Sequence, residues 1–245
     1  MPRATLVLLC IAIATGCSTR HYLTPGAGVD LASIDDARTR PAIESIPAAA
    51  FPATIALVRV QASGYRSYSN SSFGRGPLGV VTTRDAESPE DLFALDNLPR
   101  VSAVVPLNRF LLPPWVQSRS DLRAAAAMLR ADMLLAYSID TSFHVGGKDI
   151  GPLSALPLGA APKDGVYVTT TATAALLDAR TGFVYGLAEG TARDDKVAYR
   201  SSETASVEQA RLSNEAAAFS ALVGRIAELW DGILAEHDTT RRAAN

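Results

Sequence analysis

Cysteine and histidine are scarce in this chain of 245 residues, which has two cysteines and three histidines. Two cysteines cannot form a disulfide framework, and no His or Cys pair stands at the spacing of a zinc site. Acidic residues number 25 and basic residues 23, without the clustered basic face of a nucleic-acid-binding protein. We therefore predict no metal, no cofactor and no nucleic-acid partner.

The apolar run at the N-terminus, residues 6–14, is too short to cross a bilayer as a helix. It follows the positive charge of Arg3 and leads into the small residues Ala14-Thr15-Gly16. This order is typical of a signal peptide that is cleaved before Cys17. Residues 1–16 are therefore predicted to be a signal peptide.

The segment Ala14-Thr15-Gly16-Cys17 resembles the lipobox of bacterial lipoproteins, although the lipobox usually has leucine where this chain has Ala14. The resemblance implies that Cys17 carries acyl chains, palmitate among them, on its sulfur and on its new amino terminus. Several acyl chains anchor a protein stably without a spanning helix. Ser18 stands where the inner-membrane retention signal has aspartate, which implies the outer membrane with the body on its periplasmic face. An ordinary secretory signal with an incidental cysteine is the alternative.

Composition divides the rest of the chain into three parts. Residues 17–52 are rich in Ala, Pro, Asp, Arg and Ser without a sustained apolar period, which predicts a lipidated N-terminus followed by a flexible tether. A β-branched apolar run begins at Ala53, so a single α+β periplasmic domain is expected over 53–236. Residues 237–245 are expected to form a disordered tail.

Hydrophobic periodicity predicts elements in the order β-α-β-α-β-β-β-α. The expected strands cover residues 53–60, 101–106, 132–140, 166–177 and 183–192. Two expected helices start near Ser88 and Ser120, and a third lies within 204–236, where apolar residues from Phe219 to Leu234 recur at helical spacing. We predict an α+β fold, with a single mixed or antiparallel sheet of about five strands covered by three helices.

Two segments carry a resemblance to known periplasmic domains: DLRAAAAMLRADMLLAYSIDT at 121–141 and AALLDARTGFVYGLAEGTA at 174–192. They resemble the α/β domain of CsgG-like lipoproteins and of the N-terminal part of TolB. The chain also resembles the rhombotarget lipoproteins, but its C-terminal segment AEHDTTRRAAN lacks their Gly-Gly sorting tail. The resemblance implies a periplasmic α+β domain and, as one possibility, a subunit of a secretion channel.

Two connections are candidates for contact with a partner. The loop 63–79 contains Tyr65, Tyr68, Phe73 and Arg75, which we predict to form an exposed partner-binding loop. Its GRGPLG segment matches G-x-G-x-x-G, but no strand leads straight into it and no helix opens from it, so we do not predict a nucleotide site. The second connection, residues 144–165, is rich in proline and glycine and suits a lid or docking loop.

Three functions from different classes remain open. The first is a non-catalytic lipoprotein of the cell envelope that binds another envelope protein or supports an assembly. The second is a subunit of a CsgG-like secretion channel. The third is a periplasmic hydrolase that uses His144 with Ser142 and Asp140, although the sequence around them shows no nucleophile elbow. We expect the first function, and no enzymatic activity.

Overall fold

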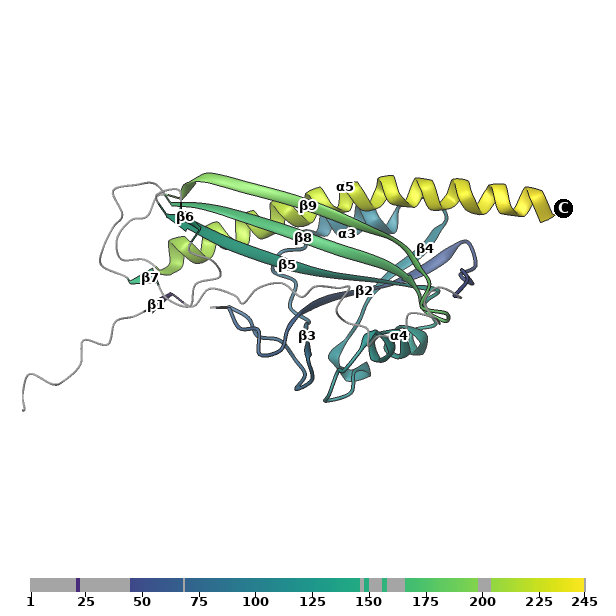
Figure 1. The fold of residues 1–245 in the computed structure, drawn as a ribbon, viewed down its shortest axis with the longest axis horizontal. Coiled ribbons are helices and arrows are strands. Elements are labelled where there is room, and N and C mark those ends of the chain that lie inside the picture. Colours follow the sequence, from purple (N-terminus) through teal and green to yellow (C-terminus); the bar gives the residue numbers. More distant parts are fainter. Residues whose placement is uncertain are drawn as a thin grey trace, which may run out of the picture.

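The computed structural model describes residues 21–22, 45–67, 69–145, 148–149, 156–157, 166–197 and 204–244. Its strands are β1 His21–Tyr22, β2 Ala53–Ala62, β3 Leu78–Val81, β4 Val101–Pro106, β5 Met133–Val145, β6 Lys148–Asp149, β7 Leu156–Pro157, β8 Val166–Asp178 and β9 Val184–Val197. Its helices are α3 Pro89–Asp96, α4 Arg119–Met128 and α5 Thr204–Ala244, with a 3-10 helix η2 at Arg109–Leu111. Each of the eight elements that the sequence predicts is present (Figure 1).

The main sheet is mixed and has the strand order β3-β2-β5-β8-β9, with β4 also paired to β2 and β6 to β5. Strand β2 runs parallel to β4 and β5, whereas the remaining pairs are antiparallel. The predicted α+β class and its mixed sheet are confirmed. The sheet has seven strands instead of about five because β3 and the two-residue β6 join it.

Helix α5 covers one face of the sheet and lies against β8 and β9 (Figure 1). The predicted apolar stripe is confirmed as a core face, since Phe219, Ile226 and Trp230 are all buried in one cluster with residues of β2, β5 and β8. Gly190 on β9 makes a close approach possible, because a Cβ atom there would lie 2.2 Å from the backbone nitrogen of Leu222 on α5. Helix and sheet therefore pack backbone to backbone at this point.

Helix α4 covers the other face, where Leu122 and Ala125 pack against the residues of β2 and β5 that point away from α5. The helix begins one residue earlier than predicted. The backbone N–H of Ser118 donates to Oδ2 of Asp121 across 3.2 Å, which is half of a capping box that starts the helix at Arg119. Helix α3 begins as predicted, because the Ser88 hydroxyl accepts from the Asp91 N–H across 3.0 Å.

The predicted limits of the domain need correction at both ends. Helix α5 continues to Ala244, so the disordered tail predicted over 237–245 is wrong for its described residues 237–244. Residues 45–52, assigned to the flexible tether, pack against the domain through Phe51, whose ring contacts Trp230 at a centroid distance of 5.6 Å. Composition did not predict this contact, because the run of alanine and proline has no apolar period.

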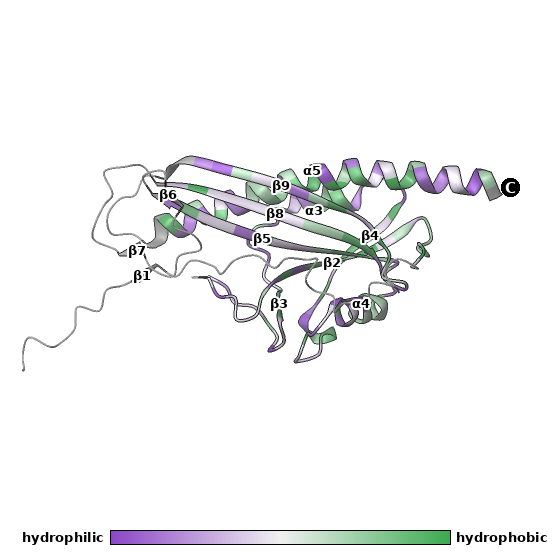
Figure 2. Ribbon diagram, in the orientation of Figure 1, coloured by the Kyte–Doolittle hydropathy of each residue, from purple (hydrophilic) through white to green (hydrophobic). Residues whose placement is uncertain are grey.

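The strands β5, β8 and β9 change in polarity along their length (Figure 2). After its first three residues, strand β8 has the threonine-rich stretch 169–173 and then the apolar stretch 174–177, which leads to the turn before β9. Gly182 closes that turn with a φ of 76°, as the predicted hairpin requires. The apolar stretch of β8 lies in the core. The threonine-rich stretch of β8 lies between β5 and β9 at the polar end of the sheet.

Candidate functional site

The predicted partner-binding loop, residues 63–79, is folded back onto the domain. Tyr65 is only 3% exposed, and its hydroxyl accepts a hydrogen bond from Nη2 of Arg59 across 3.4 Å. The Arg59 guanidinium also lies 5.9 Å from the centre of the Tyr65 ring. The prediction that Tyr65 is exposed for a partner is therefore wrong, because the arginine of the neighbouring strand binds it inside the core.

The other three predicted residues of that loop have different places. Phe73 is half-buried and its backbone N–H donates to the Val80 carbonyl across 2.7 Å, which makes it a packing residue of the second core. Arg75 is exposed, as predicted, and its backbone N–H donates to the Pro114 carbonyl across 2.9 Å. Tyr68 lies outside the described residues, as does Cys17. Of the three predicted residues that the structure describes, Tyr65 is buried, Phe73 is half-buried and Arg75 is exposed.

Beside Arg75 lies a segment for which the sequence predicted a turn with Trp115 as an anchor and no binding role, residues 107–117, which we call the aromatic loop. Its Phe110 is 91% exposed and its Trp115 is 56% exposed. The same segment inserts Leu107, Leu112 and Val116 into the core next to α4. Three buried anchors therefore hold two exposed aromatic side chains in a fixed loop. The signal was the LLPPWVQ sequence, in which two prolines precede the tryptophan in a connection.

A second feature that was missed is a buried group of charges, which we call the ionic cluster: Arg59, Asp85, Glu208, Arg211 and Glu215. Arg211 on α5 donates to Oε1 of Glu208 across 2.7 Å and to Oε1 of Glu215 across 2.5 Å. Arg59 on β2 donates to Oε2 of Glu215 across 3.0 Å and to Oδ1 of Asp85 across 2.9 Å. Each guanidinium is hydrogen-bonded to two carboxylates, which compensates the cost of burying it.

The ionic cluster ties three parts of the chain together, because its members come from β2, from the stretch after β3 and from the first turns of α5. Burial alone would lower the pKa of Arg211, but its hydrogen bonds to Glu208 and Glu215 outweigh this and hold the pKa above its ordinary value. Arg211 is therefore charged at neutral pH and pairs with both carboxylates. The cluster fixes the start of α5 over the sheet and holds the loop 63–79 in place.

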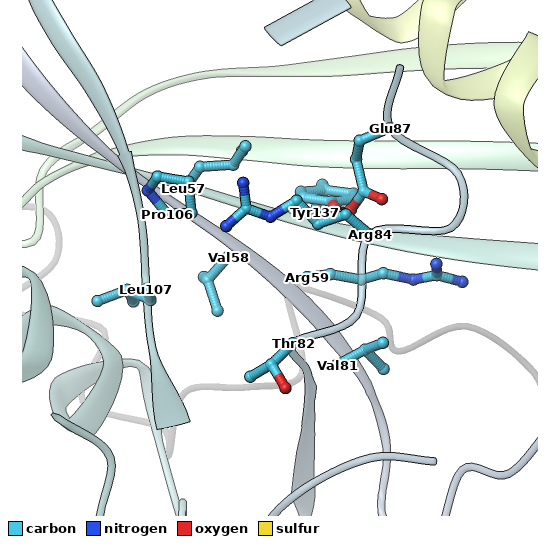
Figure 3. Close-up of a pocket in the computed structure, with 10 residues that line it drawn as sticks. All are labelled: Leu57, Val58, Arg59, Val81, Thr82, Arg84, Glu87, Pro106, Leu107 and Tyr137. Carbon is cyan, nitrogen blue, oxygen red and sulfur yellow. Dashed lines mark hydrogen bonds between the residues drawn. The ribbon is translucent and has the colours of Figure 1, made fainter. Parts of the chain in front are cut away.

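Figure 3 shows the side chains that line a small cavity next to the ionic cluster. It has a volume of about 20 Å³ and is lined by Arg59, Glu87 and Tyr137 among others. That space suits about one water molecule. Burial raises the pKa of Glu87 above its ordinary value, although the charge of Arg59 opposes the shift, and the Tyr137 hydroxyl donates to Glu87. The arrangement is that of a buried structural group.

The residues considered for a hydrolase, Asp140, Ser142 and His144, lie on one face of β5 at two-residue intervals. The His144 ring stacks on the Tyr167 ring at a centroid distance of 4.5 Å, and the Arg193 guanidinium lies 4.4 Å from the centre of Tyr167. The three groups make a stack across β5, β8 and β9. The structure thus brings His144 into contact with an aromatic ring on the neighbouring strand.

Within the described residues, no three His, Cys, Asp or Glu side chains come together in a way that holds a metal ion. None of the helices in the described ranges has the combined length and apolarity of a bilayer-spanning segment. Only the short strands β6 and β7 of the predicted docking loop 144–165 are described beyond the end of β5. The candidate site with exposed binding groups in a fixed frame is therefore the aromatic loop with Arg75.

No family model matches the sequence, and no curated protein matches it. Among solved structures, protein XCC0632 from Xanthomonas campestris, of the DUF330 family, is 16% identical, with a TM-score of 0.33 over 77% of this chain and 94% of that one. The hypothetical protein CT253 from Chlamydia trachomatis is 11% identical, with a TM-score of 0.29 over 71% of this chain and 95% of that one. At these TM-scores, neither likeness carries an argument about function.

Proposed function

We propose that the chain is a lipoprotein of the bacterial outer membrane, anchored on the periplasmic face through an acylated Cys17, and that its α+β domain binds another envelope protein without catalysis. The lipobox at residues 14–17 supports the anchor. The exposed aromatic loop is the observation that carries the binding function. A domain that exposes Phe110 and Trp115 while burying Leu107, Leu112 and Val116 of the same loop has a surface suited to a partner.

The physical argument concerns both residue type and rigidity. Tryptophan and arginine are the side chains that most often dominate the binding energy at protein interfaces, because each combines a large contact area with a polar group. Arg75 is exposed, and its backbone N–H donates to the carbonyl of Pro114, the residue before Trp115, so its main chain lies next to the aromatic loop. The buried anchors Leu112 and Val116 keep the loop in one conformation. Binding then costs little conformational entropy in the loop.

The test uses the full-length protein in the membrane of a cell that expresses it. A photo-crosslinking amino acid is placed at position 110, at position 115 or, as a control, at Phe93, which is 69% exposed on α3. We expect positions 110 and 115 to give the same adduct with one envelope protein and position 93 not to give it. The variant Phe110→Ser with Trp115→Ser should lose co-purification of that protein without a change in melting temperature.

Two results contradict the proposal. One is equal recovery of the partner by wild type and by the Phe110→Ser, Trp115→Ser variant. The other is a ring of many copies of the chain that conducts ions across liposomes, which favours the secretion-channel hypothesis instead. Measuring the mass by light scattering and the conductance in the same preparation distinguishes a secretion channel from a binding lipoprotein.

A further inference from the structure

A cavity of about 320 Å³ lies on the face of the sheet that α5 covers. It is bounded by residues 47–51, the hairpin of β8 and β9, and the later turns of α5. Phe51, Phe183 and Tyr185 line it together with Ile233, Glu236 and His237. An engineered protein cavity of about 150 Å³ binds benzene, so this one has room for a ligand about twice that size. The ionic cluster and the aromatic loop take no part in its walls.

The walls of this cavity are fixed by contacts that exist without a ligand. The backbone N–H of Ala48 donates to Oδ2 of Asp178 across 2.6 Å, and that of Ala49 donates to the Tyr185 hydroxyl across 3.3 Å. The Tyr185 hydroxyl in turn donates to Oδ2 of Asp178 across 3.0 Å. Phe51 packs edge-on against His237 with a centroid distance of 4.7 Å. The site is therefore preformed, as binding pockets usually are.

The aromatic rings favour a positively charged ligand, because the face of an aromatic ring carries negative partial charge. The protein already uses this property on one ring. The Arg100 guanidinium lies 4.9 Å from the centre of Phe51. Phe183 and Tyr185 stand edge to face at 5.1 Å with an interplanar angle of 81°, so two further rings with different orientations border the same cavity.

The charges around the cavity favour the same ligand. Arg100 is paired with Asp238 at 2.8 Å. No lysine or arginine is among the described residues that line the cavity, whereas Glu236 brings a carboxylate to its wall. Asp178 stands directly behind Tyr185 as a second carboxylate. An anionic ligand would be repelled by both carboxylates, of which Glu236 is exposed and Asp178 is buried.

We propose that this cavity binds a small organic cation, namely a substituted ammonium group that carries an apolar substituent. The methyl groups of such a cation contact the aromatic rings, and Glu236 balances its charge. A free amine and the headgroup of a choline lipid share this chemistry. The inference does not rest on the proposed function, because the aromatic loop belongs to the core cluster on the other face of the sheet.

The test is calorimetric titration of the full-length protein in a maltoside detergent. The probes are choline, benzyltrimethylammonium, the neutral choline isostere 3,3-dimethylbutan-1-ol and the anion 3,3-dimethylbutanoate. We expect benzyltrimethylammonium to bind most tightly, because its phenyl group fills the remaining volume, and choline to bind more tightly than the isostere. Glu236→Gln and Phe183→Leu should each weaken choline binding by about three- to five-fold, the range of a single cation–ring or charge contact. Glu228→Gln, an exposed carboxylate on the same helix outside the cavity, should leave it unchanged.

Vesicles separate the two sources of the cation. Protein that binds phosphatidylcholine vesicles more tightly than phosphatidylglycerol vesicles, with the difference lost in Glu236→Gln, assigns the site to a lipid headgroup. Binding of choline and benzyltrimethylammonium without that vesicle preference assigns it to a free amine. Equal binding of the neutral isostere, tighter binding of the anion, or no binding of any probe overturns the proposal. So does unchanged choline binding in both Glu236→Gln and Phe183→Leu.

Discussion

Arg59 on β2 donates to Glu215 on α5 across 3.0 Å, and each side chain is 1% exposed. The two residues are 156 positions apart in the sequence. A buried ion pair of this kind contributes little net stability over an apolar pair, but it specifies which surfaces meet. Here it fixes the first turns of α5 above the central strands.

Removing Glu215 should therefore destabilise the domain strongly. The variant Glu215→Ala leaves Arg59 and Arg211 buried with one carboxylate partner fewer each, and we expect a loss of about 3–5 kcal/mol in the free energy of unfolding. The control is Glu228→Ala, which breaks the exposed pair with Arg225 and should cost less than about 1 kcal/mol. Denaturant titration measures both. Similar losses in the two variants would show that the cluster is not buried.

The two tryptophans offer a second comparison on one side-chain type. Trp230 is 0% exposed and donates its indole N–H to the Pro99 carbonyl across 2.8 Å, so Trp230→Ala should cost about 3–5 kcal/mol. Trp115 is 56% exposed, so Trp115→Ala should change the free energy of unfolding by about 0.5 kcal/mol at most. Thermal melting of both variants checks this. A large loss in Trp115→Ala would mean that Trp115 is a core residue.

Periodicity and caps were sufficient to predict the α+β class and the order of the eight predicted elements. The stripe from Phe219 to Leu234 gave the core face of α5, and Ser88 with Pro89 gave the start of α3. The end of α5 was not predictable in the same way, because the polar residues after Glu236 have no apolar period. Contacts with distant residues accompany that last part of the helix, such as the pair of Asp238 with Arg100 at 2.8 Å. Contacts between residues far apart in the sequence cannot be predicted from hydrophobic periodicity.

The site was less predictable because exposure depends on tertiary packing. Tyr65 and Trp115 both stand in loops with proline or glycine nearby, yet the first is buried and the second exposed. The difference comes from Arg59, whose charge inside an apolar strand requires partners and draws Tyr65 and Glu215 inward. An arginine in such a strand was the available signal. The matching acids at i−3 and i+4 around Arg211 were another.

Asp178 should make stability depend on pH on the acid side. Burial would raise its pKa, but hydrogen bonds from the backbone of Thr181, Ala48 and Arg180 and from Tyr185 outweigh it and lower the pKa below its ordinary value. A carboxylate with a lowered folded-state pKa stabilises the fold above its unfolded pKa and loses this contribution as the pH falls through its folded pKa. The stability advantage of wild type over Asp178→Asn, about 1–3 kcal/mol near neutral pH, should therefore shrink below about pH 4. Denaturant titrations at several pH values test this, and an advantage that grows on acidification contradicts it.

Cys17 should be the attachment point of the lipid anchor. The variant Cys17→Ala should lose acyl-chain labelling and lipoprotein-type cleavage. Cys10→Ala is the control, because its cysteine lies within the predicted signal peptide and should leave labelling unchanged. Labelling that persists in Cys17→Ala would refute the lipobox interpretation.

Two glycines should respond in opposite directions to the same substitution. In Gly190→Ala, the new Cβ would lie 2.2 Å from the Leu222 nitrogen and 2.6 Å from the Ala218 carbonyl oxygen, both on the backbone of α5. The helix must then move off β9, and we expect a loss of about 1–3 kcal/mol. Gly224 has nothing within 4 Å of such a Cβ and lies inside α5, so Gly224→Ala should stabilise the domain by about 0.5–1 kcal/mol. The two free energies of unfolding are measured by denaturant titration under the same conditions. Equal effects of the same sign would mean that α5 does not pack against Gly190, because only that contact distinguishes the two sites.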